Sequence, residues 1–223
     1  MDAETILQYA GVLSFLLLSL SVHESAHAWT ADRLGDPTAR ALGRVTLNPA
    51  AHLDLFLSVL LPLVTYWAMG VPFGAGKPVP VNVLNLGHPR RDWMLVALAG
   101  PCSNLLLALL TTIAWFILDA AGLVEPHSIA LHLFRVGVLM NVSLAVFNLI
   151  PIPTLDGSRV IGYLLPEQAA IRWYELDRYG FLILLGLLML PNIAPGLDVL
   201  RLIVVSVSIP ILGLLNGIFG LPI

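Results

Sequence analysis

The sequence predicts an all-α polytopic membrane protein, and three observations support this fold class. Of the 223 residues, 58% are hydrophobic and 11% are charged, against roughly 25% charged in an average soluble domain. The mean hydropathy is +0.89. Several uninterrupted apolar runs are longer than a buried core helix needs, and they are long enough to cross a bilayer. A soluble monomer is therefore excluded.

The apolar runs are each bounded by charges, Pro or Gly, and they predict five or six membrane segments. They cover residues 5–31, 53–71, 93–120, 130–150, 179–191 and 197–220. The N-terminus has no basic region and no cleavage site, so we expect the first helix to be retained and not removed as a signal peptide. We divide the chain into a membrane-embedded core, residues 1–165, and a C-terminal transmembrane hairpin, residues 166–223.

The basic residues of the short connections predict the orientation in the membrane. Residues 121–129 contain no Lys or Arg, whereas the connections around 32–52, 77–91 and 159–178 contain several. Because basic connections stay on the cytoplasmic side, residues 121–129 are predicted to lie outside, and the segment beginning near Asp156 at the cytoplasmic face. Residues 53–92 then form a re-entrant element. A full crossing at 53–71 is the alternative, since membrane helices tolerate Pro.

Charge and cysteine content exclude two other classes of function. The formal charge of −3, from 11 Lys and Arg against 14 Asp and Glu, provides no basic face for a phosphate backbone, so no nucleic-acid partner is expected. The single cysteine, Cys102, lies in an apolar run. It excludes an intrachain disulfide, and we expect it to be a small buried hydrophobic residue.

The first apolar helix contains the pattern HExxH, with His23, Glu24 and His27. Side chains at i and i+4 share one face of a helix, so both imidazoles can reach one tetrahedral metal ion. Glu24 is offset around the helix, which suits a general base better than a third ligand. Pairing among these side chains is the alternative. Because an ionisable group inside a membrane segment costs roughly 2.5 to 3.5 kcal/mol, we favour a compensating metal ion.

A catalytic zinc site has three protein ligands and one open position. Asp156 is the best candidate for the third ligand, because Pro151 and Pro153 break the preceding helix at the same predicted membrane face. His52 and Asp54 are rival candidates. They stand beside a polar loop, where capping a helix is the simpler role.

Two motifs together resemble the site-2 protease family of intramembrane zinc metalloproteases, in its short form without a PDZ domain. These are HESAH in an apolar helix and NLIPIPTLDG at residues 148–157. Residues 74–82 are similar to the family's membrane-associated β-hairpin, and residues 99–104 to its G-P-x-x-N helix. The resemblance covers residues 14–165. Residues 77–83, with Pro at alternate positions, form either an extended segment able to pair with a substrate strand or a plain polar loop.

The resemblance implies the site and its chemistry. His23, His27 and Asp156 would bind one Zn²⁺, and Glu24 would activate the attacking water. Asn148 would be an active-site amide that hydrogen-bonds the substrate backbone or the developing oxyanion. The site would lie toward the cytoplasmic side of a multi-pass protein of the cell membrane.

The implied function is regulated intramembrane proteolysis of single-span membrane proteins. A metal transporter and a non-catalytic zinc-binding scaffold are the alternatives, and Glu24 distinguishes them because an ion pathway needs no general base. The sequence departs from the larger family members in lacking a PDZ domain and a helix before HExxH, which leaves substrate recruitment open. It specifies neither the substrate nor the oligomeric state.

Overall fold

The computed structural model describes residues 3–61, 63–65, 76–194 and 196–222. The described residues are mostly helical and contain no strand, which confirms the all-α fold class. The longer helices are α1 (Ala3–Arg33), α4 (Pro89–Ala120), α5 (Ile129–Asn148), α8 (Gly180–Ile193) and α9 (Val199–Phe219). The shorter ones are α2 (Thr38–Ala41), η1 (Pro49–His52), η2 (Leu55–Leu60), η3 (Val83–Asn85), α6 (Asp156–Leu164), α7 (Glu167–Glu175) and η4 (Leu176–Tyr179).

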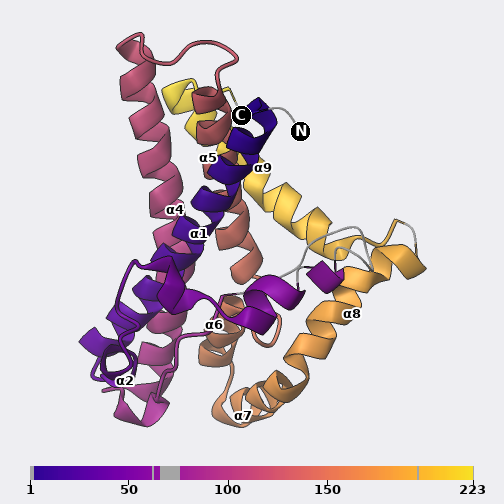
Figure 1. Cartoon of the computed structure of the whole chain (residues 1–223). Helices are drawn as coiled ribbons and strands as arrows, with labels where there is room; N and C mark the ends of the chain where they lie inside the picture. The colour runs from indigo at the N-terminus through magenta and orange to yellow at the C-terminus, as the bar shows by residue number, and fades with distance from the viewer. Residues whose placement is uncertain (1–2, 62, 66–75, 195, 223) are drawn as a thin grey trace.

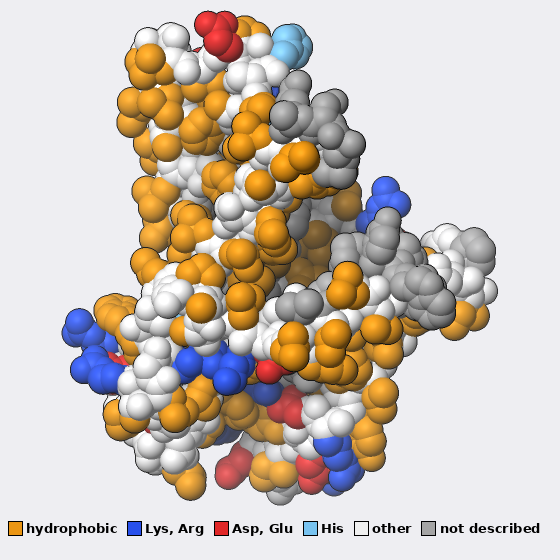
Figure 2. Space-filling model, in the orientation of Figure 1, with side chains coloured by type: hydrophobic (Ala, Val, Ile, Leu, Met, Phe, Trp, Pro, Cys, Tyr) orange, Lys and Arg blue, Asp and Glu red, His pale blue; other side chains and the backbone are white. Residues whose placement is uncertain are grey.

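Five helical stretches of the described chain are long and apolar enough to cross a membrane. They are Thr5–Arg33, Pro89–Ala120, Ile129–Asn148, Glu167–Ile193 and Val199–Phe219. Large apolar side chains remain exposed along their outer faces, and Figure 2 shows hydrophobic atoms over most of the upper part of the molecule. Such a surface is suited to lipid, because exposed apolar patches of this extent are rare on soluble proteins. The predicted multi-pass membrane protein is confirmed.

The predicted segment at residues 53–71 is only partly described. Its described part contains η2 and a short helical continuation to residue 65, and it is not among the five candidate spans. Residues 66–75 lie outside the described residues, so crossing and re-entry both stay predictions. Residues 76–82, the described part of the expected β-hairpin, form irregular chain without strand pairing.

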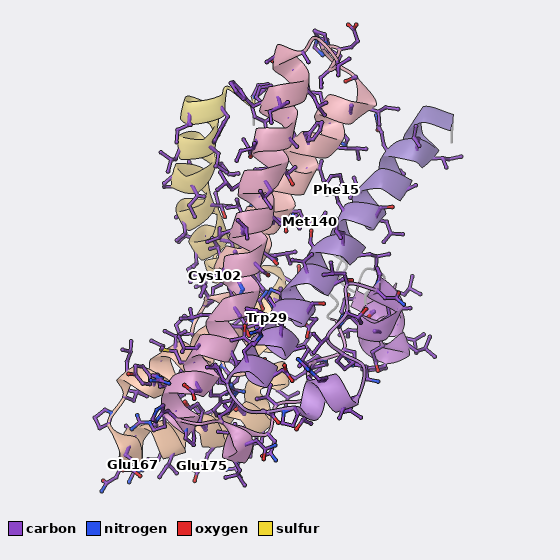
Figure 3. All side chains as sticks on the ribbon, turned by 90° about the vertical axis from the view of Figure 1, so that its left-hand side faces the viewer. Phe15, Trp29, Cys102, Met140, Glu167 and Glu175 are labelled. Atoms are coloured by element: carbon purple, nitrogen blue, oxygen red, sulfur yellow. The ribbon has the colours of Figure 1, made fainter. Side chains whose placement is uncertain are left out.

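Helices α1, α4 and α5 form the centre of the bundle, and α9 packs against α4 and α5 (Figure 1). Figure 3 shows α1 and α4 crossing, with Phe15 on the upper half of α1. Phe15 packs on α5 where Gly137 leaves room, since a Cβ added there would lie 2.8 Å from its ring. The apolar core between α4, α5 and α9 includes Trp115, Val138 and Leu215. Phe15 thus packs α1 against α5, and the apolar core packs α5 against α4 and α9.

Helices α6 and α7 lie beside the lower half of this bundle. The chain leaves α5 at Asn148, turns through residues 149–155 and enters α6 (Figure 1). Arg90, at the start of α4, donates from Nη2 to the carbonyls of Gly162, Tyr163 and Leu165, the last at 2.6 Å. These bonds satisfy carbonyls at the C-terminal end of α6 that have no intrahelical partner. The beginning of α4 therefore anchors α6.

The prediction that Cys102 is buried is wrong. Its side chain is exposed on α4, two residues after Gly100, which faces α1. In a membrane protein an apolar side chain can face lipid as readily as the protein core, so apolar character alone does not predict burial.

Candidate metal centre

His23 and His27 of α1 point to the same side of the helix, as their spacing predicts. Both are buried, and their Nε2 atoms lie 3.0 Å apart. This part of α1 packs against α4, and among the neighbouring residues Ala28 is fully buried whereas Trp29 is exposed. The HExxH pattern therefore brings two imidazole nitrogens to one point inside the bundle.

Helix α4 sets the orientation and the tautomer of His27. Its Nδ1 lies 2.7 Å from the carbonyl oxygen of Val96, and because a carbonyl can only accept, Nδ1 carries the proton. The lone pair is then on Nε2, the form of imidazole that binds a metal. Gly100 permits the close approach of the helices, since a Cβ added there would lie 2.6 Å from Cε1 of His23.

The turn between α5 and α6 delivers the third ligand. Asp156 is the first residue of α6, and its carboxylate oxygens lie 3.2 Å from Nε2 of His23 and 3.4 Å from Nε2 of His27. Gly157 makes this possible because its backbone packs directly on residues 149–150. A Cβ added to Gly157 would lie 2.7 Å from the Ile150 carbonyl oxygen.

The three side chains fit a zinc ion. One ligand atom from each of His23, His27 and Asp156 lies within 4.8 Å of the others. Two ligands at about 2.1 Å from a tetrahedral ion lie about 3.4 Å apart, close to the separations of these atoms. The carboxylate oxygens of Asp156 face Nε2 of His23 and Nε2 of His27, the atoms that would share the ion with it. A carboxylate binds a metal in its ionised form, so metal binding and ionisation of Asp156 favour each other.

Glu24 faces a cavity that opens beside these ligands. The cavity has a volume of about 450 Å³ and is lined by residues of α1, α4, α5, α6, α8 and the segment 76–81. The backbone N–H of Val79 donates to Glu24 Oε2 at 3.2 Å. The cavity is large enough for an extended peptide segment to bring a carbonyl group to the ligands. Phe181 and Leu184 of α8 form part of its wall.

Asn148 also lines this cavity, at the last position of α5. Its Nδ2 donates to the Leu144 carbonyl at 3.0 Å, which leaves a second proton on the amide for another acceptor. The structure therefore brings all five predicted site residues to one cavity.

The rival ligands lie elsewhere. His52 is buried, with Nε2 2.7 Å from the Thr46 carbonyl, and it is outside the group of candidate metal ligands in the described chain. Asp54 accepts at 2.9 Å from the backbone N–H of Phe56, at the start of η2. Asp54 therefore has the capping role that was its simpler alternative, whereas the His52 bond joins η1 to the preceding loop and caps no helix.

Sequence reasoning missed the residues that support the site. Arg159 lies one turn after Asp156 on α6, with its guanidinium 4.4 Å from the Trp93 ring and paired with Asp177 at 2.5 Å. The i+3 spacing from Asp156 is a signal that could have indicated a shared face. These contacts tie α6 to α4 and η4, and so they support Asp156.

Asp36 is the second supporting residue that the sequence analysis missed. It is fully buried and accepts hydrogen bonds from Thr38, the Asn82 backbone and the Asn85 side chain, at 2.5 to 3.2 Å. Burial alone would raise its pKa, but these hydrogen bonds hold the pKa of Asp36 below its usual value. The Asp-Pro-Thr sequence signals a local turn at this position, but the bonds to residues 82 and 85 have no sequence signal.

The fold and the site define a class: a multi-pass membrane protein with a His-Glu-x-x-His helix and an aspartate that completes a metal centre. The sequence profile described as Peptidase family M50 matches residues 124–190. No solved structure gives a significant match.

Several curated protein sequences are similar to this chain. A Bacillus subtilis protein named "Putative zinc metalloprotease YwhC" is 36% identical over 179 residues, which are 79% of this chain and 78% of that protein. "Putative zinc metalloprotease Rip2" of Mycolicibacterium smegmatis is 35% identical over 199 residues, 85% of this chain and 73% of that protein. "Stage IV sporulation protein FB" of Bacillus subtilis is 29% identical over 189 residues, 77% of this chain and 58% of that protein.

The chain belongs to peptidase family M50, the site-2 proteases. The predictions of the family, of a zinc metallopeptidase and of one zinc cofactor are thereby confirmed.

Proposed function

We propose that this chain hydrolyses peptide bonds within the spans of single-span membrane proteins, in regulated intramembrane proteolysis. The observation that carries the proposal is the meeting of His23, His27, Glu24 and Asp156 at one cavity among membrane helices. Membership of the M50 family supports hydrolysis over ion transport, and a transport pathway has no use for a general base beside the first histidine.

In this proposal His23, His27 and Asp156 hold the zinc ion, which when bound polarises the scissile carbonyl and acidifies the attacking water. Glu24 accepts the proton of that water, and then donates it to the leaving amine. The Val79 N–H orients the Glu24 carboxylate from the other side of the cavity. Asn148 supplies its free amide proton to the substrate backbone or to the developing oxyanion.

We also propose that the site faces the cytoplasm from within the cell membrane. The end of α1, helices α2 and α7 and the start of α4 gather at the lower end of the molecule, and Figure 2 shows most of the Lys and Arg side chains of this face in its lower half. The connection 121–128 at the opposite end contains none. Basic connections remain cytoplasmic. His23 precedes the end of α1 by ten residues, which is about 15 Å of helix.

Cysteine labelling tests the orientation in intact cells. On a Cys102→Ser background, a membrane-impermeant thiol reagent should modify Glu125→Cys from outside. Arg172→Cys should react only after the membrane is opened. The reverse pattern would refute the cytoplasmic site.

We further propose that the chain divides after residue 165 into a membrane-embedded core and a C-terminal hairpin. Helix α8 belongs to the hairpin, although it contributes to the wall of the cavity.

Cleavage mapping tests the activity. The purified chain is reconstituted in liposomes with a panel of single-span substrates, and the products are identified by mass spectrometry. We expect cuts inside the span in its cytoplasmic half, complete inhibition by a zinc chelator and recovery on adding zinc. Cuts confined to soluble parts of the substrates would refute the intramembrane proposal.

A further inference from the structure

The described segment 76–85, which we call the strap, runs along the cavity beside Glu24. The Val79 N–H donates to Oε2 of Glu24 at 3.2 Å, and a Cβ added to Gly76 would lie 3.5 Å from Oε1. Gly76, Pro78, Val79 and Val81 line the cavity. The position of the strap therefore determines the position of the carboxylate.

Arg44 holds the end of the strap nearest to Glu24. Its Nη2 donates to the Lys77 carbonyl at 2.5 Å, while the Lys77 N–H donates to the His52 carbonyl at 2.8 Å. Arg44 is only 6% exposed, and no ion pair with a carboxylate is found for it in the described chain. Burying a guanidinium without a counter-ion is unfavourable in free energy, and the charge-assisted hydrogen bond to the Lys77 carbonyl offsets part of this cost.

Asp36 holds the other end of the strap. Its carboxylate accepts from the Asn82 N–H at 2.7 Å and from the Asn85 side chain at 2.9 Å. The Gly87 N–H donates to the Leu34 carbonyl at 3.1 Å, which joins the chain just after the strap to the end of α1. With both ends fixed to residues that follow α1, the strap keeps its register against Glu24, which lies on α1.

We propose that Arg44 is a positioning residue for the general base. Through the Lys77 carbonyl it fixes the strap, and through the Val79 N–H the strap fixes the Glu24 carboxylate in the orientation that accepts a proton. The inference rests on the proposed role of Glu24. A shift of about 1 Å in a catalytic group can cost about 100-fold in rate, so a residue that touches no substrate can still control turnover.

The first test compares Arg44→Met with Arg40→Met. Arg40 is exposed and pairs with Asp32 of α1, so its loss removes an Arg from the same connection without touching the strap. We expect Arg44→Met to lower kcat about 10- to 100-fold, with KM within about twofold and zinc retained at about one ion per chain. Arg40→Met should match the wild type. Unchanged kcat in Arg44→Met, or loss of zinc together with activity, would overturn the proposal.

Arg44→Lys keeps a cation and one donor able to reach Lys77, so it should recover part of the lost kcat. This variant also covers the case in which Arg44→Met does not fold. A Lys variant that folds, binds zinc and is no more active than Arg44→Met would contradict the proposed hydrogen bond.

A double-mutant cycle tests whether Arg44 acts through Val79. Val79→Pro removes the N–H that reaches Glu24, in a segment that already has Pro on both sides. If both substitutions remove one interaction, the double variant has nearly the kcat of a single variant. Independent effects would multiply, and that result would overturn the proposal. If the zinc-loaded wild type cuts no membrane substrate, the proposed function itself fails, and this outcome is distinct from either result of the cycle.

Discussion

The metal ligands and the strap flank Glu24, and the protein holds them by different means. The ligands are held by close backbone packing, at Gly100 against the imidazoles and at Gly157 against residues 149–150. The strap is held by hydrogen bonds to the buried charges of Arg44 and Asp36. The ligand side should therefore be sensitive to the volume of one methyl group, and the strap side to donors, acceptors and pH.

The largest effect is expected on the ligand side, from Gly157→Ala. The added Cβ would meet the backbone of residues 149–150, which cannot move without displacing Asp156. We expect zinc affinity to fall at least about 100-fold, and cleavage to fall with it. Zinc titration of the purified protein measures this. Gly186→Ala in α8 is the control, because its Cβ meets nothing within 4 Å. Wild-type zinc affinity in Gly157→Ala would contradict packing as the means of holding Asp156.

Gly100→Ala should have the next largest effect. Its Cβ would lie 2.6 Å from His23 Cε1, so α1 and α4 must separate slightly or the imidazoles must turn. Because such displacements of ligand support weaken metal binding, we expect about a 10-fold loss of zinc affinity. Gly213→Ala, in open space on α9, serves as the comparison. Equal affinities in the two variants would show that helix contact at Gly100 is unimportant.

On the strap side, we expect Asp36→Asn to lower the free energy of unfolding. An amide cannot accept from all the donors that converge on Asp36, and leaving one buried donor unsatisfied costs about 1 to 3 kcal/mol. Thermal unfolding in detergent measures the loss. Asp119→Asn, exposed near the end of α4, should leave the Tm unchanged. A Tm equal to the wild type in Asp36→Asn would mean that the strap is held elsewhere.

The smallest expected effect is the pH dependence of that difference. The pKa of Asp36 is lowered in the folded state, so its contribution to stability is present above the usual carboxyl pKa of about 4. It is lost as the pH falls through the lowered value. The Tm gap between wild type and Asp36→Asn should therefore be constant from about pH 8 to 5 and shrink below about pH 4. A Tm gap that widens in acid would contradict a lowered pKa of Asp36 in the folded state.

The same comparison explains what the sequence could predict. His23, Glu24 and His27 follow from helical periodicity, and the membrane helices follow from hydropathy. Asp156 could be proposed because prolines and a glycine mark its turn. The bonds of Arg44 to Lys77 and of Asp36 to Asn82 join residues 33 and 46 positions apart. No periodicity signals such contacts, so the strap's supports were missed.

Cys102 shows a second limit of sequence reasoning. Its apolar surroundings predicted burial, but the side chain is exposed on α4. Hydropathy detects a membrane helix without separating its lipid-facing side from its protein-facing side, because lipid is as apolar as the core. Hydropathy also does not predict that the polar side chains of Asn104 and Asn141 are fully buried between helices.

The most direct test of the account measures zinc content and intramembrane cleavage together, in the wild type and in Glu24→Gln. The substitution leaves His23, His27 and Asp156 in place and removes the carboxylate that accepts the proton. The account predicts about one zinc ion per chain in both proteins, with cleavage by the wild type alone. Cleavage by Glu24→Gln at the wild-type rate would contradict the role of Glu24 as the general base.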